Sequence, residues 1–225
     1  VKHLLYPGDS TSGKVGSKVI PKPTTISFRL ASREVKRTLA AFLNDRNLIF
    51  PDVEPHGLEY YVGKDEKQGA IYIPFYEREV IREGVTRLNL TFYTLRFIIG
   101  DMQSRYIFPS ALGYPRLYTN LWNYVEEPLI LVEGVFDALR LHKLGYTAIA
   151  LNGKRINPLQ LSTLLTLRPS KVIILLDEDA ILSAVDIRNT LKAVLTVPVH
   201  LAYLKTGKDP ASALAGDVHD TIRMV

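Results

Sequence analysis

The sequence predicts an α/β protein in which a doubly wound, mostly parallel sheet flanked by helices follows a smaller mixed α+β subdomain. From about residue 126 onward, continuous apolar runs alternate with helical segments, which is typical of parallel strands that crossover helices bury on both faces. The preceding region alternates apolar and polar residues and is rich in β-branched and aromatic side chains, as antiparallel strands are. We therefore divide the chain into a linker or arm (1–25), an α+β subdomain (26–125) and a doubly wound subdomain (126–225).

The first half is predicted to contain one helix and several strands after a linker. Residues 1–25 are rich in Gly, Ser, Pro and Lys and show no sustained period, as expected for a linker. Within them, residues 8–15 imitate a nucleotide-binding P-loop, but Val15 stands where a Ser or Thr would reach magnesium, so we do not expect one. Apolar residues at helical spacing predict an amphipathic helix over residues 32–43, with Ser32 as its N-cap. Strands are expected at 69–75, 87–93 and 94–100.

The second half is predicted to repeat a strand–helix unit. Each continuous apolar run has the length of a buried strand, and each following segment has the spacing of a helix. This repetition places the strands in one sheet whose ligands bind at the carboxyl ends of the strands. The strands are expected at 128–133, 147–151, 171–176 and 197–203, and the helices at 135–144, 158–167 and 184–194.

Composition limits the classes of function. Of the 225 residues, 47% are apolar, which is enough for a packed core. No apolar stretch approaches the roughly 18–20 uncharged residues of a membrane-spanning helix, so we expect no membrane partner and a cytoplasmic protein. The chain has no cysteine, which excludes cysteine zinc sites and iron–sulfur clusters and leaves oxygen as the main metal ligand. The net charge of +5 and the pI near 9.3 favour a polyanionic partner, and the initial valine suggests a piece of a longer polypeptide.

Acidic residues follow two of the predicted buried strands. Glu133 closes one strand, and Asp177, Glu178 and Asp179 close another. Carboxylates at one edge of a sheet are partly desolvated and repel each other, so a cation is expected to compensate them. Oxygen ligands suit Mg²⁺ or Mn²⁺ rather than zinc. The sequence therefore predicts a divalent-metal site built from Glu133, Asp177 and Asp179.

A structural interpretation of the same acids stays open. Taken singly, Glu133 would cap the helix that follows it, and residues 177–179 would form an ordinary polar turn. Asp209 follows the last predicted strand. It would either join the same edge of the sheet or begin a plain Asp-Pro turn, and we weigh these two interpretations equally.

Three segments of the second half resemble a known family. Residues 131–139, 176–180 and 207–210 occur in the order of the glutamate, Asp-x-Asp and Asp-Pro elements of the Toprim domain in bacterial-type (DnaG-type) primases. Asn152-Gly153 stands where that family has a glycine turn after its second strand. Toprim domains also occur in topoisomerases, nucleases and recombination proteins, so this half does not distinguish among them.

The first half is similar to the beginning of the primase catalytic core. Residues 41–48 and 56–60 resemble its opening helix and its glycine-leucine turn. Arg96 and the pair Arg105-Tyr106 follow the order of its phosphate-contacting sheet region. The resemblance spans about Arg33 to Ala215 and is closer in the Toprim part.

The resemblance implies a primase catalytic core that synthesises RNA primers on DNA. The expected cofactor is Mg²⁺ or Mn²⁺, and the expected partners are a single-stranded DNA template, ribonucleoside triphosphates and, as a further candidate, a replicative helicase. The expected compartment is the cytoplasm of a bacterial cell or a phage-infected host. The resemblance assigns catalysis and metal binding to Glu133, Asp177 and Asp179, further metal contacts to Asp137 and Asp209, and nucleotide or nucleic-acid contacts to Arg96, Arg105, Tyr106 and Lys154.

The chain departs from the family pattern at several points. Glu178 stands where the family usually has glycine, and Arg105 stands where it has lysine, which changes the geometry of phosphate binding. The zinc-binding module that commonly precedes the core cannot lie in a cysteine-free chain. Two other functions remain: a Toprim nuclease or topoisomerase-related fragment that cleaves DNA, and a non-catalytic nucleic-acid-binding module.

Overall fold

The structure is a computed structural model, and it describes most of the chain. Three predictions lie outside the described residues: residues 1–21 of the arm with the P-loop-like stretch, Arg105, and the subdomain boundary near residue 125. The predicted end of the arm at residue 25 was wrong, because Thr25 already pairs with Tyr61 in the first sheet. The described residues are 22–62, 69–82, 85–99, 106–108, 113, 115–118, 127–206 and 209–225.

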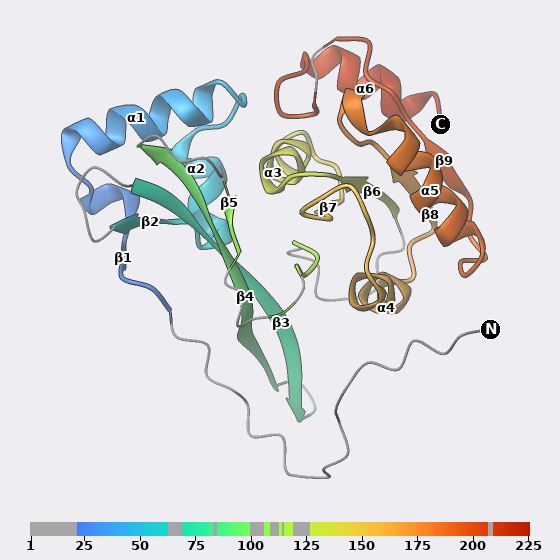
Figure 1. Ribbon diagram of the computed structural model, residues 1–225, viewed down its shortest axis with the longest axis horizontal. Helices are drawn as coiled ribbons and strands as arrows, with labels where there is room; N and C mark the ends of the chain where they lie inside the picture. The colour runs from blue at the N-terminus through green and yellow to red at the C-terminus, as the bar shows by residue number, and fades with distance from the viewer. Residues whose placement is uncertain are drawn as a thin grey trace.

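Two sheets lie side by side, each with its own helices (Figure 1). The first is an antiparallel sheet in which the described strands follow the order β1-β2-β3-β4-β5. Its strands are β1 (Thr25–Ile26), β2 (Glu59–Val62), β3 (Gly69–Arg82), β4 (Val85–Ile99) and β5 (Tyr106–Ile107). Helices η1 (Phe28–Leu30), α1 (Arg33–Asn44), α2 (Phe50–Val53) and η2 (Glu54–His56) complete this subdomain.

Two features of the first subdomain test the sequence predictions. Ser32 caps α1 as expected, because its hydroxyl accepts a hydrogen bond from the backbone N–H of Val35 at 3.3 Å. The prediction of two strands at 87–93 and 94–100 was wrong, because one continuous strand, β4, spans Val85–Ile99. No turn residue separates Tyr93 from Thr94, so the chain continues alongside β3 and extends with it as the long hairpin of Figure 1.

The second subdomain is a parallel sheet covered by helices on both faces, which confirms the predicted fold class. Its strand order is β7-β6-β8-β9. The strands are β6 (Pro128–Val132), β7 (Ala148–Ala150), β8 (Lys171–Ile174) and β9 (Val199–Leu201), and the helices are α3 (Val135–Lys143), α4 (Pro158–Leu167), η4 (Glu178–Ala180), α5 (Ile181–Lys192) and α6 (Ala215–Arg223).

Alternation along the buried strands explains the two helix layers. Ile130 and Val132 of β6 belong to a core shared with α3 and α6, whereas Leu129 and Leu131 belong to a core shared with α4 and α5. Successive side chains of a strand point to opposite faces, so a continuous apolar run fills both cores at once. Each of these four side chains is at most 1% exposed.

The two subdomains share one hydrophobic core. Leu39 of α1 and Phe75 of β3 lie in the same cluster as Phe136 of α3. The ring of Phe42 meets the ring of Phe136 edge-on, with centroids 5.0 Å apart. This apolar contact holds α1 of the first subdomain against α3 of the second. No helix in the described part of the chain is long and apolar enough to cross a membrane.

Candidate metal centre

The order of the parallel strands determines where a ligand can bind. The chain leaves β6 through α3 to β7 on one side, then returns through α4 to β8 on the other side of β6. The crossovers therefore diverge between β6 and β8, and ligands of open α/β sheets bind at the carboxyl ends of strands at such a switch point. Glu133 directly follows β6, and Asp177 follows β8.

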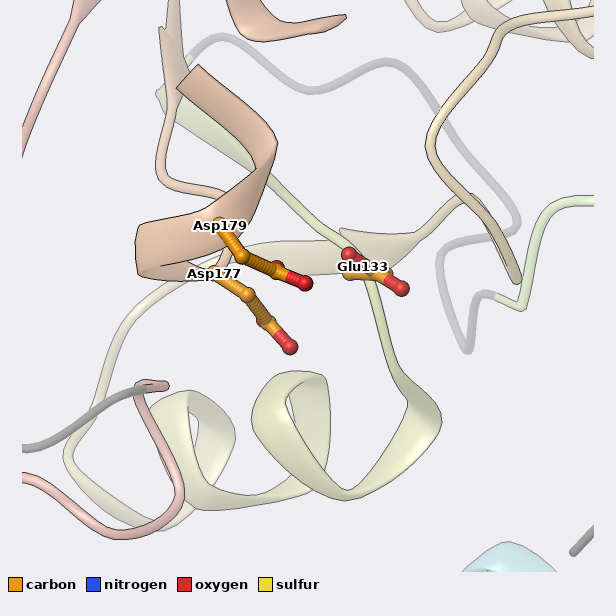
Figure 2. Close-up of side chains that lie close together, drawn as sticks. All are labelled: Glu133, Asp177 and Asp179. Atoms are coloured by element: carbon orange, nitrogen blue, oxygen red, sulfur yellow. The ribbon is translucent and has the colours of Figure 1, made fainter.

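Three carboxylates converge at this switch point. Glu133, Asp177 and Asp179 each offer an oxygen, and these oxygens lie within 4.8 Å of one another. Figure 2 shows the Glu133 side chain approaching from the end of β6, while Asp177 and Asp179 approach together from η4. The turn of η4, closed by a hydrogen bond from the Ala180 N–H to the Asp177 carbonyl at 2.9 Å, directs both aspartates toward Glu133.

The donor atoms fit a divalent cation. Oε2 of Glu133 and Oδ1 of Asp177 are buried and accept no hydrogen bond from the described residues. Buried carboxylate oxygens are normally paired, and leaving them unpaired is costly. An all-carboxylate set with one exposed member, Asp179, is what Mg²⁺ or Mn²⁺ accepts while keeping bound water. These three residues would hold the ion.

Burial and mutual repulsion perturb the acids of this group. Burial, reinforced by the charges of Glu133, Asp209 and Asp179, raises the pKa of Asp177 from 3.8 to about 7. Burial also raises the pKa of Glu133, and Lys154 opposes that shift. The pKa of Asp179 is lowered, mainly by its hydrogen bond with Lys154. A bound cation would relieve the repulsion that raises the pKa of the first two acids.

Lys154 lies beside the group of three acids, and its predicted contact with nucleotide or nucleic acid stays a prediction. Its Nζ is 2.6 Å from Oδ2 of Asp179. The turn after β7 holds it there, because the Asn152 N–H donates to the Glu133 carbonyl at 2.8 Å and the Asn152 side chain donates to the Arg116 carbonyl at 2.9 Å. Asn152 adopts a φ of 58° and Gly153 a φ of 150°, so the glycine turn read from the sequence has the backbone that favours Asn and Gly.

Asp137 lies beside the group of three but is engaged by the backbone. Its Oδ2 accepts from the Gly134 N–H and its Oδ1 from the Ala211 N–H, both at 3.1 Å. A Cβ at position 134 would stand 2.7 Å from Oδ2, so a larger residue there would displace the Asp137 carboxylate. Burial raises the pKa of Asp137 well above its ordinary value, with Asp209 and Asp177 adding to the shift. Asp137 thus joins the start of α3 to the turn near Ala211, and its role as a metal ligand stays a prediction.

The structure contradicts the capping role considered for Glu133 and shows a turn at Asp209. Gly134, not Glu133, is the N-cap residue of α3, so the capping role considered for Glu133 was wrong. Asp209 begins a turn, as the Asp-Pro interpretation expected, because its Oδ1 accepts from the Ser212 N–H at 2.7 Å. Among the described residues, Asp209 lies outside the group of three, although its charge raises the pKa of Asp177. A metal contact by Asp209 stays a prediction.

Arg96 and Tyr106 lie together on the antiparallel sheet of the first subdomain. They are paired on β4 and β5, and the guanidinium carbon of Arg96 lies 4.7 Å from the Tyr106 ring centroid. Burial raises the pKa of Tyr106, Arg96 opposes the shift, and the charges of Asp137 and Asp177 add to it, so Tyr106 lies within electrostatic reach of the acids. Arg96 is only 7% exposed. The nucleotide contacts of both residues stay predictions.

A cavity of about 500 Å³ adjoins Lys154. It opens at the carboxyl end of β7 and includes Leu151, Gly153 and Ile156 in its lining. Asn157 and Gln160 also line it, and their amides donate to the carbonyls of Pro115 and Leu151. Sequence reasoning missed this cavity, since it forms between the segment after β7 and Pro115, which lies far away in the sequence.

Comparisons with known proteins agree with the observed fold. Residues 128–195 match the family model of the Toprim domain, while no curated protein sequence matches the chain. A crystal structure of the zinc-binding and RNA polymerase domains of the Aquifex aeolicus primase is similar, with a TM-score of 0.62 and 19% identity. The similarity covers 87% of this chain and 56% of that one, so this chain spans little more than half of that structure.

Two further structures are similar over most of this chain. The primase fragment of the bacteriophage T7 primase-helicase protein has a TM-score of 0.53 at 18% identity and covers 80% of this chain and 72% of its own. A DnaG primase catalytic domain bound to single-stranded DNA has a TM-score of 0.59 at 15% identity and covers 83% and 72%. At these identities the likeness establishes the fold. Residues 128–195 therefore form a Toprim domain, in a chain that has the fold of these primase catalytic cores.

Proposed function

We propose that this chain is the catalytic core of a DNA primase, which joins ribonucleotides into a primer on a single-stranded DNA template. The observation that carries the proposal is the convergence of Glu133, Asp177 and Asp179 at the switch point of a Toprim domain. The fold shared with primase structures over most of the chain supports it. The net charge of +5 suits a nucleic-acid template.

In the proposed reaction, a 3′-hydroxyl loses its proton to solvent and attacks the α-phosphorus of a ribonucleoside triphosphate, and pyrophosphate leaves with the electrons of the broken P–O bond. A Mg²⁺ or Mn²⁺ ion bound at the centre would lower the pKa of the hydroxyl and neutralise charge on the transferring phosphate. Glu133 and Asp177 would hold the ion from the ends of β6 and β8, and Asp179 from η4. Lys154 would exchange its contact with Asp179 for a phosphate oxygen of the substrate.

The partners of the proposed reaction come from the same comparisons. The similar DnaG domain is bound to single-stranded DNA, and the similar T7 fragment belongs to a primase-helicase protein. We extend both to this chain as proposals: a single-stranded template, and a replicative helicase as a further partner. Arg96 and Tyr106, which are paired on β4 and β5 of the first subdomain, would contact the nucleotide or the template.

Incorporation of labelled ribonucleotides on single-stranded DNA tests the proposal. We expect primers with Mg²⁺ or Mn²⁺ from the wild type, and a loss of about a hundredfold or more in Asp177→Ala and Glu133→Gln, because each change removes a ligand of an ion worth several kcal/mol to the transition state. Glu178→Gln, in the same turn but exposed and outside the group of three, serves as the control. DNA cleavage without primers would instead favour a nuclease, and neither activity would favour a binding module.

Replacing Lys154 with methionine should affect substrate binding more than stability. The pair with Asp179 is solvent-exposed, with 39% and 75% of the two side chains accessible, and exposed pairs contribute little to stability. We expect an unchanged unfolding midpoint and a KM for ribonucleoside triphosphate raised about tenfold, through loss of one charge-assisted contact. Lys192→Met, on the exposed side of α5, should change neither quantity. An unchanged KM in Lys154→Met would remove Lys154 from the site.

A further inference from the structure

Asn47 adopts an unusual backbone conformation between the two subdomains. It follows α1 and has a φ of 54°, in the left-handed region that non-glycine residues rarely occupy. Asparagine tolerates this conformation better than most residues but still at some cost. Such a conformation persists where surrounding contacts stabilise it, so the contacts of Asn47 indicate its role.

Both ends of Asn47 contact the second subdomain. Its backbone carbonyl accepts hydrogen bonds from Lys143 Nζ at 3.0 Å and from Arg140 Nη1 at 3.4 Å, both on α3. Its side-chain amide donates to the carbonyl of Ala211 at 2.8 Å. Asn47 therefore connects α1 to two separate parts of the second subdomain, α3 and the turn that begins at Asp209.

The contact with Ala211 continues to the acidic group. The N–H of Ala211 donates to Asp137, whose other oxygen accepts from the N–H of Gly134. Gly134 directly follows Glu133, and Asp209 begins the turn that contains Ala211. A continuous path of hydrogen bonds thus runs from the Asn47 amide, through the turn and Asp137, to the backbone beside Glu133.

The apolar interface holds the two subdomains together, whereas the Asn47 amide constrains the position of the turn that begins at Asp209. The Phe42–Phe136 contact and the shared core hold the subdomains together, but apolar contacts do not specify the register of a polar turn. A directional hydrogen bond to the Ala211 carbonyl specifies the register of that turn. The Asn47 amide therefore constrains the distance between Asp209 and Asp177. The charge of Asp209 contributes to the raised pKa of Asp177.

We infer that Asn47 is a positioning residue for the metal centre: its side chain holds the Asp209 turn against the acidic group, so that the first subdomain sets the geometry of a site built on the second. The inference rests on the proposed function of the acidic group as a metal centre. It gives Asn47, which lies between α1 and α2, a role beyond linking two helices.

Binding of Mn²⁺ alone to the whole chain tests the inference without requiring catalysis. Asn47→Gly keeps the left-handed backbone at no steric cost and removes only the amide. We expect its Mn²⁺ dissociation constant, measured by electron paramagnetic resonance, to rise about fivefold, the effect of one hydrogen bond. Asn47→Asp, which places an acceptor opposite the Ala211 carbonyl, should weaken binding at least as much.

Two further variants separate positioning from a merely structural role. Lys143→Met removes the contacts of Lys143 with the Asn47 carbonyl and with Asp52, so it should lower the unfolding midpoint while leaving Mn²⁺ affinity near that of the wild type. In an Asp209→Asn background, Asn47→Gly should cause little further loss, because both changes act through one turn.

The outcomes decide the inference and the proposed function separately. Wild-type Mn²⁺ affinity in Asn47→Gly, an equal loss in Lys143→Met, or an undiminished loss in the Asp209→Asn background would each overturn the inference. A wild type that binds no Mn²⁺ would overturn it as well. If the wild type binds Mn²⁺ but makes no primers, the proposed function fails while the Mn²⁺ data still decide the role of Asn47.

Discussion

Asp177→Asn is expected to stabilise the metal-free protein near neutral and alkaline pH while it abolishes activity. The pKa of Asp177 is raised from 3.8 to about 7 in the folded protein, first by burial and then by neighbouring acids. A carboxyl with a raised folded pKa retains its proton on folding, so the folded state loses stability as the pH rises from about 3.8 to about 7. Asparagine has the same shape and no charge, and it avoids this loss.

The size of this effect is limited by solvent. A shift of this size corresponds to about 4 kcal/mol for a fully shielded group, but Asp177 is only half-buried, so we expect about 1–2 kcal/mol after screening. Urea unfolding in the presence of a chelator should show Asp177→Asn more stable than the wild type at about pH 8 and equal to it at about pH 4. Glu178→Gln, at the exposed neighbouring position, should not be stabilised.

Equal stability of Asp177→Asn and wild type at about pH 8 would contradict the raised pKa of Asp177 in the folded protein. The accompanying activity loss, about a hundredfold or more, follows from removal of a ligand. The two effects together distinguish a metal centre from an ordinary turn. If Asp177 were only part of a turn, its replacement by asparagine would alter stability without removing primer synthesis.

Affinity for Mn²⁺ is expected to fall about tenfold when the pH is lowered from about 8 to about 6. Carboxylates bind the ion in their ionised form, and the pKa of Asp177 lies at about 7, within this interval. A proton on Asp177 therefore competes with the ion as the pH falls. Titration of the chain with Mn²⁺ at several pH values, followed by electron paramagnetic resonance, measures the effect.

Asp179→Asn provides a matched comparison for this pH dependence. The pKa of Asp179 is lowered by Lys154, so this residue stays ionised throughout the interval. Its replacement should weaken Mn²⁺ binding at every pH and move the midpoint of the pH dependence to lower pH, because the charge of Asp179 contributes to the raised pKa of Asp177. An affinity that does not change between about pH 6 and about pH 8 would show that Asp177 is not a ligand.

The second subdomain was predictable because its elements are local patterns with a known arrangement. A run such as Leu129–Val132 identifies a strand buried on both faces, and repeated strand–helix units fix the right-handed crossovers of a parallel sheet. The carboxyl ends of β6 and β8 then meet at one edge, so Glu133, Asp177 and Asp179 were expected to converge, and they do. Composition could also exclude cysteine ligands.

The first subdomain was harder to predict because antiparallel pairing leaves weaker signals. Nothing in the alternation of residues 87–100 shows whether a strand continues or turns, and the structure has one strand, Val85–Ile99. The side-chain contacts of α1 could not be predicted from the sequence either, because Phe42 meets Phe136 on a helix far away in the sequence. Such contacts depend on how the subdomains pack, which propensity and periodicity do not encode.

The sequence by itself therefore determined the parallel sheet and the three acids that would hold a metal ion, because strand ends and residue types are local properties. The tertiary structure alone decided which polar groups serve the site indirectly. It placed Asp137 between the N–H groups of Gly134 and Ala211, and it brought the Asn47 amide to the Ala211 carbonyl across 164 positions. The physical reason is that a hydrogen bond depends on distance and direction in the folded chain, which no spacing along the sequence specifies.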